Sequence, residues 1–236
     1  MPDESFADAP VLSPGARLQP SARALLLVLN FIPLLHAALI AATVLMLRVP
    51  FAGRAAAGLA VLYLVPPLVV RALLSVAPVK EGRIAADSRG FFVWWTTFQW
   101  QVIFCRFPAL EEVLRLIPGL YSLWLRLWGA RVGRLTFWAP GTLILDRPFL
   151  LIGDGVVFGA GVRLNAHVLA KGSAGAVELQ LATIVIGDGA SIGGYSLLTA
   201  GTEIAPGEAT RAFLISPPFS KWRDGKRVRA GETDGD

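Results

Sequence analysis

A bulky apolar residue followed by a small residue returns every six positions through the second half of this chain. Residues 151–170 read "LIGDGVVFGAGVRLNAHVLA", and in them the pair begins at Ile152, Phe158 and Leu164. Six is the period of neither a helix nor a strand. It fits short flat strands joined by tight corners, with the bulky side chain in a narrow core and the small residue where the backbone turns. Three such sides make one coil, so the repeat predicts a triangular prism of stacked parallel strands.

The repeat can be followed through ten turns and is interrupted twice. A slip of two residues at 150–151 breaks the register, and a non-repeating stretch fills residues 170–185. Ten turns predict about three coils, near the minimum for a stable stack. We therefore expect a β-helix domain over residues 131–212 and a basic C-terminal tail over residues 213–236. The turns begin at Val132, Trp138, Ile144, Ile152, Phe158, Leu164, Ile186, Ile192, Leu198 and Ile204.

The first third of the chain is too apolar for an ordinary soluble domain. The whole chain is 54% hydrophobic, with a mean hydropathy of +0.58. Residues 24–47 carry no formal charge, and residues 55–79 carry only Arg71. Crossing a hydrocarbon core of ~30 Å takes about 20 helical residues. We expect a disordered tail over residues 1–22 and a hairpin of two transmembrane helices within residues 23–79. A signal peptide, or two buried helices of a soluble protein, are the alternatives.

The segment between the hairpin and the repeat, residues 80–130, predicts helices at the membrane surface. Residues 91–105, "FFVWWTTFQWQVIFC", are too few for a span, and tryptophan prefers the headgroup level. Residues 110–133 show helical spacing on both sides of a break at Pro118 and Gly119. They predict two short amphipathic helices that lie on the membrane, cover the end of the following domain, or do both.

The charges around the hairpin favour a cytoplasmic location for both termini and for the C-terminal domain. Arg48 and Arg54 in the hairpin loop are opposed by a larger basic set outside it, namely Arg17, Arg23, Lys80, Arg83 and Arg89. Basic residues favour the cytoplasmic side. The sequence thus predicts a multi-pass protein of the inner (cytoplasmic) membrane. Its net charge of +5 suits an anionic membrane surface or an anionic ligand.

The motifs "IGDGVVFGAGVRLNAH" and "IGDGASIGGYSLLTAGTEIAPG" resemble those of the hexapeptide-repeat acyltransferases, and the resemblance covers residues 120–212. The stretch before them, "IPGLYSLWLRLWGARVG", looks like the approach to the β-helix in acetyltransferases of exopolysaccharide pathways. It is similar too to the C-terminal modules of poly-amino-acid synthetases. The resemblance implies a left-handed parallel β-helix, a homotrimer with sites between subunits, and an acyl thioester donor. That donor would be acyl-coenzyme A or an acyl carrier protein.

His167 is the only histidine of the predicted β-helix, and it comes shortly before the non-repeating stretch. A neutral imidazole near pH 7 can take a proton from an attacking hydroxyl or amine. The resemblance places a general base at this point of the fold. It makes Asn165 a candidate for orienting the acceptor or polarising the thioester, and Glu178 a candidate for orienting the imidazole. The alternatives are a corner histidine without a role and an asparagine that merely suits a tight turn.

The resemblance also implies a groove for the donor beside the later coils. Small residues that could line it are Gly193, Gly194, Ala200 and Gly201, and basic residues that could reach its phosphates are Lys221, Arg223, Lys226 and Arg227. The basic stretch could equally be solvated or contact lipid headgroups. No glycine-rich phosphate loop or zinc-ligand spacing occurs, and we expect neither a metal nor a nucleic-acid partner.

These features predict a membrane-anchored acyltransferase. It would move an acetyl or longer acyl group to a hydroxyl or amine of an acceptor held in lipid, with membrane lipid as its surroundings. Two other functions stay open: a non-enzymatic β-helix scaffold on the membrane, and an accessory module of a synthetase.

Overall fold

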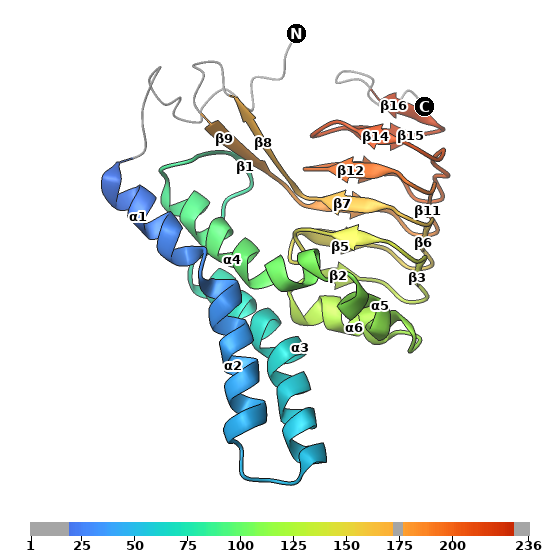
Figure 1. Ribbon diagram of the computed structural model, residues 1–236. Coiled ribbons are helices and arrows are strands. Elements are labelled where there is room, and N and C mark those ends of the chain that lie inside the picture. Colours follow the sequence, from blue (N-terminus) through green and yellow to red (C-terminus); the bar gives the residue numbers. More distant parts are fainter. Residues whose placement is uncertain (1–18, 172–176, 229–236) are drawn as a thin grey trace.

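The computed structural model describes residues 19–171 and 177–228 as a helical part followed by a stack of short strands (Figure 1). The helices precede the stack in the chain and lie beside its first coils. They are α1 (Pro20–Leu29), α2 (Ile32–Met46), α3 (Phe51–Val76), α4 (Arg89–Arg106), α5 (Ala109–Arg115) and α6 (Leu120–Leu127).

Three sheets form the walls of a parallel β-helix. The widest sheet contains β2 (Arg131–Val132), β5 (Leu150–Ile152), β10 (Ile184–Ile186), β13 (Glu203–Ile204), β15 (Lys221–Arg223) and β16 (Lys226–Val228). The second contains β3 (Phe137–Trp138), β6 (Val157–Phe158) and β11 (Ser191–Ile192). The third contains β4 (Leu143–Ile144), β7 (Arg163–Asn165), β12 (Leu197–Thr199) and β14 (Ile215–Ser216). From β2 to β7 and from β10 to β13, successive strands of the chain visit the three sheets in turn, as the six-residue period predicts.

The predicted register is confirmed by the strand pairing. Ile152 pairs with Val132 on one side and Ile186 on the other, and Leu164 lies likewise between Ile144 and Leu198. These bulky residues are buried and form the ladders of the core. The small partners are needed at the corners: a Cβ on Gly153 would lie 2.6 Å from the backbone nitrogen of Asp188 in the next coil. The left-handed sense of the coils stays a prediction.

The β-helix extends beyond its predicted end at residue 212. β14 pairs in parallel with β12, β15 pairs in parallel with β13, and β16 folds back antiparallel on β15. The prediction of a basic tail over residues 213–236 was therefore wrong for residues 213–228. The repeat was hidden because Ser216, which pairs with Leu198, puts a small polar residue where the earlier coils have a bulky one. Phe213 and Phe219, at φ 57° and 60°, also take corner positions that hold Tyr195 and Gly201 in the coil before. Residues 229–236 lie outside the described part of the chain.

The first predicted span is broken into two helices. α1 ends before Asn30, and α2 begins at Ile32 with Pro33 in its first turn, where the missing N–H of proline costs nothing. The Asn30 side-chain oxygen accepts hydrogen bonds from Trp95 and Gln99 of α4. The segments Pro20–Met46 and Phe51–Val76 are each long and apolar enough to cross a membrane. Because α1 begins at Pro20, the tail expected over residues 1–22 ends earlier, and residues 1–18 lie outside the described chain.

The helices after the hairpin join it to the β-helix. α4 packs against α1, α2 and α3, and its buried face includes Phe91, Trp94 and Phe104. α5 and α6 are separate helices around Gly119, whose φ is +80°, as the break in the sequence predicts. α6 packs on β2 and so covers the first coil. The expectation that the linker helices also lie on the membrane stays a prediction.

The non-repeating stretch forms a hairpin of β8 (His167–Lys171) and β9 (Val177–Leu181). β9 also pairs antiparallel with β1 (Gly82–Ala85), which lies between α3 and α4 in the chain. Glu81 accepts hydrogen bonds from the backbone N–H and the hydroxyl of Thr183 at the base of this hairpin. The β8–β9 hairpin is therefore fixed by contacts with β1 and Glu81 of the same chain.

Candidate active site

Both interruptions of the six-residue repeat fall at the same corner of the prism. A regular corner between the third and the widest sheet takes residues 200–202, between β12 and β13. In the first coil, residues 145–149 make this connection between β4 and β5, and in the second coil residues 166–183 make it between β7 and β10. The chain thus adds residues at one edge, in two consecutive coils, without disturbing the ladders inside.

The two interruptions bring Asp146 and His167 into contact. Nδ1 of His167 lies 2.6 Å from Oδ2 of Asp146, and the other carboxylate oxygen accepts a hydrogen bond from Nε1 of Trp94 at 3.0 Å. The Asp146 side chain is 1% exposed and that of His167 13% exposed. An ionised carboxylate only accepts hydrogen bonds, so in the neutral imidazole Nδ1 carries the proton and Nε2 has the free lone pair. Within the described chain, Nε2 has no hydrogen-bond partner.

Two aromatic side chains of α4 hold the imidazole ring. The ring centroids of Trp94 and Phe98 lie 4.8 and 5.3 Å from that of His167, both in edge-to-face geometry. The two residues are four positions apart and therefore share a face of the helix. Together with the bond to Asp146, these contacts fix the orientation of the ring.

The carboxylate that contacts His167 is Asp146, and Glu178 lies elsewhere. Glu178 sits on β9 opposite Ala170 and Ala85, and its Oε1 is 3.5 Å from Nε of Arg83. Asp146 was not among the site residues predicted from the sequence. The available signal was the two-residue slip itself, because residues added at a corner can leave the ladder and point a polar side chain outward.

Asn165 is the last residue of β7 and precedes His167 by two positions. Its side-chain oxygen is buried without a hydrogen-bond partner within the described chain. Such an unpaired acceptor costs about 1–3 kcal/mol, so a ligand with an N–H or O–H group could satisfy it. The position beside His167 suits the orienting role predicted for Asn165, which stays a prediction.

The residues predicted to bind the donor are divided between two corners and one sheet. Ala200 and Gly201 lie at the His167 corner in the next coil, where the Gly201 amide donates to the carbonyl of Ala182. Gly193 and Gly194 lie at a different corner, between β11 and β12. The structure thus brings only the first pair to the edge that carries the histidine.

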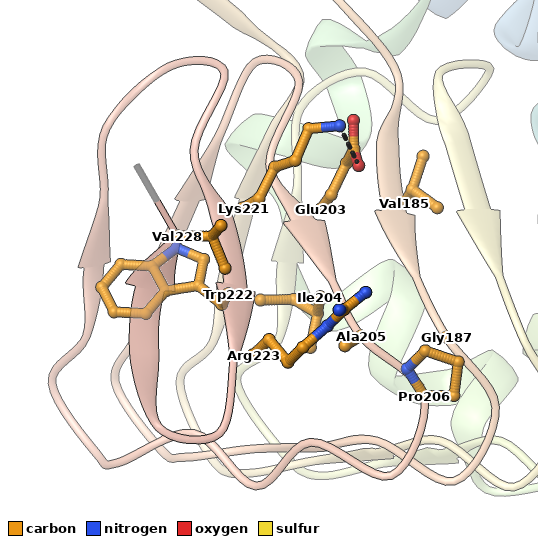
Figure 2. A pocket seen from close by; sticks show the side chains of 10 residues that line it. All are labelled: Val185, Gly187, Glu203, Ile204, Ala205, Pro206, Lys221, Trp222, Arg223 and Val228. Carbon is orange, nitrogen blue, oxygen red and sulfur yellow. Dashed lines mark ion pairs between the residues drawn. The ribbon is translucent and has the colours of Figure 1, made fainter. Parts of the chain in front are cut away.

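Lys221 and Arg223 line a groove of about 590 Å³ on the outer face of the widest sheet (Figure 2). Nζ of Lys221 lies 3.0 Å from Oε2 of Glu203, and the Arg223 side chain extends past Ala205. The other two basic residues of the predicted set, Lys226 and Arg227, belong to β16. The lining of the groove has two basic side chains, Lys221 and Arg223, and one carboxylate, Glu203, and it includes Trp222.

A buried ionic network anchors the residue that follows Asp146. The Arg147 guanidinium is fully buried, contacts Glu111 through Nε (2.8 Å) and Nη2, and its backbone N–H donates to Gln101 at 2.8 Å. Burial lowers the pKa of Arg147, but the charge of Glu111 offsets this and holds the pKa above its ordinary range. Tyr121 donates to the second Glu111 oxygen. The backbone beside Asp146 is thereby tied to α4 and α5.

The described residues contain no group of three histidine, cysteine or acidic side chains that could hold a metal ion. The groups present at the His167 corner are an imidazole, a carboxylate and an unpaired amide oxygen.

No protein-family model matches this sequence, and no curated protein matches it significantly. The fold is similar to that of solved hexapeptide-repeat acetyltransferases at low identity. A maltose O-acetyltransferase from Clostridium difficile 630 is 15% identical, with a TM-score of 0.38 over 70% of this chain and 97% of that one. A hexapeptide-repeat acetyltransferase from Vibrio cholerae, complexed with acetyl coenzyme A, is 16% identical, with a TM-score of 0.34 over 53% and 87%. A galactoside acetyltransferase in complex with coenzyme A is 15% identical, with a TM-score of 0.33 over 51% and 78%. Likenesses as distant as these assign no activity to the chain.

Proposed function

We propose that this protein is a membrane-anchored acyltransferase in which His167 is the general base. The observation that carries the proposal is the 2.6 Å contact between Nδ1 of His167 and Asp146, which leaves Nε2 without a hydrogen-bond partner within the described chain. A base must be both correctly protonated and within reach of the proton that it removes. Here the carboxylate fixes the tautomer, and the aromatic contacts fix the direction of the ring.

In the proposed reaction, Nε2 takes the proton of an acceptor hydroxyl or amine as its oxygen or nitrogen attacks the thioester carbonyl. The new C–O or C–N bond forms and the C–S bond breaks. The leaving thiolate takes the proton back from Nε2, which restores the neutral imidazole. Asp146 stays ionised throughout and stabilises the transient imidazolium. The Asn165 amide would orient the acceptor, whereas Glu178 has no place in this scheme.

The membrane placement follows from where charged and polar residues bound the hairpin. Asn30 and Arg48 are 18 residues apart, and Arg54 and Arg71 are 17 residues apart. At 1.5 Å per residue both intervals measure about 26 Å, close to the thickness of a hydrocarbon core. We place the near membrane boundary at Asn30 and Arg71 and the far boundary at the hairpin loop. Both termini and the β-helix then lie on the cytoplasmic side of the inner membrane.

This placement brings His167 close to the lipid surface. Trp95 and Trp94 are consecutive residues of α4: the first donates to Asn30 at the membrane boundary, and the second donates to Asp146 in the candidate site. An acceptor or acyl chain held in the bilayer would therefore be presented near the base. This supports a lipid-linked acceptor as the substrate class.

The donor would be an acyl thioester of coenzyme A or of an acyl carrier protein. Ala200 and Gly201 lie one coil beyond His167 at the same corner, where Ala200 is buried and the Phe219 ring covers Gly201, so the thioester arm would have to pass over that ring. The groove of Lys221 and Arg223 would take the phosphates of the donor. A homotrimer, expected from the resemblance, would wall this side of the site with a second copy of the chain.

His167→Ala tests the proposal. Thiol release from acyl-coenzyme A is measured with membrane lipid extract as the source of acceptor, and the variant should lose about 100- to 10,000-fold in turnover. Lys171→Ala, an exposed change on the same strand, is the matched control and should keep its activity. A well-folded His167→Ala protein with wild-type turnover would refute the assignment of the base. A folded wild-type protein that cleaves no thioester would instead favour the scaffold function.

A further inference from the structure

A second hollow lies far along the chain from His167, at the base of the β-helix. It has a volume of about 1,030 Å³ and is bounded by the end of α3, the end of α6 and strand β2. Figure 1 shows these elements beside each other where the hairpin meets the first coil. Its lining includes the three arginines Arg71, Arg126 and Arg131 and the apolar side chains of Leu74 and Leu151.

The three arginines have no acidic partner within the described chain. Arg71 donates only to the backbone carbonyl of Arg126, at 3.3 Å. Arg126 donates to the carbonyls of Val132 and Gly133, at 2.9 and 3.0 Å. The side chain of Arg131 has no hydrogen bond or ion pair there, Arg131 is exposed, and the ion pairs of the described residues involve none of the three. Three like charges around one hollow, each without a carboxylate, favour an external anion.

Two aspartates also line the hollow, and their positions show why they do not neutralise the arginines. Oδ1 of Asp154 accepts the backbone N–H of Arg134 at 2.6 Å, and Oδ1 of Asp188 accepts that of Asp154 at 2.8 Å. Both carboxylates thus cap corners of neighbouring coils. The lining of the hollow thus has three arginines and two aspartates, which gives it a net charge of +1.

The hollow also contains a tryptophan with an unused donor. Trp128 is fully buried in its wall, and its Nε1–H has no acceptor within the described residues. An unsatisfied buried donor is uncommon and is a feature of sites completed by a ligand or a water molecule. It is an observation independent of the arginine charges.

We propose that this hollow binds the phosphate of an anionic membrane phospholipid. Arg71 marks the near membrane boundary in the placement above, so the hollow opens at headgroup depth, and Leu74 lies one turn further along α3. Guanidinium groups bind phosphate oxygens in pairs, and basic pockets beside membrane helices bind anionic headgroups. The proposal rests on the membrane placement, and it does not depend on acyl transfer.

The test measures the melting temperature of the full chain, purified in a neutral detergent, against rising lipid concentration. A ligand that binds only the folded state raises the melting temperature. Dioleoyl phosphatidic acid should act at lower concentration than dioleoyl phosphatidylcholine, and inorganic phosphate alone should not reproduce the effect. Arg131→Gln should raise the required concentration of phosphatidic acid about fivefold, the contribution of one arginine near an anionic surface. Arg71→Gln is the second variant and should act in the same direction.

Arg211→Gln is the matched control, because Arg211 is an exposed arginine at a distant corner. It removes the same charge and should leave the lipid response unchanged. Equal responses to the two lipids, or equal effects of Arg131→Gln and Arg211→Gln, would overturn the proposal. So would full stabilisation by inorganic phosphate, which would make the lipid unnecessary. A chain that fractionates without the membrane in cells would refute the placement itself, whatever the outcome of the acyltransfer assay.

Discussion

Replacing Asp146 by asparagine is the sharpest perturbation of the candidate site, because it keeps the shape of the side chain and changes only its hydrogen bonding. The carboxylate accepts from Trp94 with one oxygen and from His167 with the other. An asparagine has one oxygen and one NH₂ group in these two places. If its oxygen keeps the bond to Trp94, its NH₂ group faces Nδ1 of His167. The imidazole then accepts at Nδ1 and carries its proton on Nε2, where the base is needed.

The expected loss is about 1,000-fold in kcat/KM, within the 100- to 10,000-fold that a general base contributes. If the amide turns over instead, its NH₂ group meets the Trp94 N–H, and a buried hydrogen bond is lost at a cost of about 1–3 kcal/mol in stability. Both orientations therefore harm the site. The assay follows thiol release from acyl-coenzyme A, together with the melting temperature of each variant.

Asp87→Asn is the control, since Asp87 is exposed before α4 and the change removes the same charge. The double variant of Asp146→Asn and His167→Ala should be no slower than His167→Ala alone, because the two residues act as one unit. An Asp146→Asn protein that is folded and turns over at the wild-type rate would refute the reasoning. So would additive losses in the double variant.

Other consequences of the structure can be measured on the same protein. Gly153→Ala should lower the melting temperature markedly, because the new Cβ would lie 2.6 Å from backbone of the next coil; an unchanged melting curve would contradict the coil register. Arg147→Met should cost about 3 kcal/mol in unfolding free energy, the low end for breaking a buried ion pair, because Arg115 still contacts Glu111; Arg147→Lys should recover part of it in denaturant titrations. Burial raises the pKa of the Cys105 thiol, so iodoacetamide should label it at pH 8 only after unfolding, as mass spectrometry would show. Burial, then the charge of Glu111, raise the pKa of Tyr121 well above its usual value. Its stabilisation is complete below the unfolded pKa of about 10 and is lost as the pH rises towards the folded value, so melting should fall more between pH 9 and 11 in wild type than in Tyr121→Phe.

The ladders of the β-helix could be predicted from the sequence because each bulky residue occupies a position fixed by the six-residue period. Ile152 and Leu164 needed no knowledge of distant contacts to be placed in the core. The end of the domain could not be found in the same way. Phe213 and Phe219 stand at corners with positive φ, a conformation that large side chains rarely adopt, so composition there did not resemble a corner.

The site was predictable only in part, since its residues come from separate segments. His167 could be found by its isolation and its place before the excursion. Its partner could not, because the contact with Asp146 depends on stacking of two coils, 21 positions apart in the chain. Trp94 lies 52 positions before Asp146, and no local pattern in α4 indicates which of its tryptophans meets the β-helix.

Asp146 and His167 closely follow Ile144 and Leu164, which pair in neighbouring coils of the third sheet, so the approach of the two side chains depends on the spacing of paired strands, about 4.8 Å. That spacing is a property of the peptide backbone and changes little with temperature, solvent or sequence elsewhere. Inserting a single extra coil between positions 146 and 167 would double this spacing and separate the Asp146 carboxylate from the His167 imidazole, while the β-helix itself would still form. Lengthening the prism past position 184 would leave the dyad intact. Coils can therefore be added after residue 184 without changing the contact between Asp146 and His167, whereas a coil added between these two residues would break it.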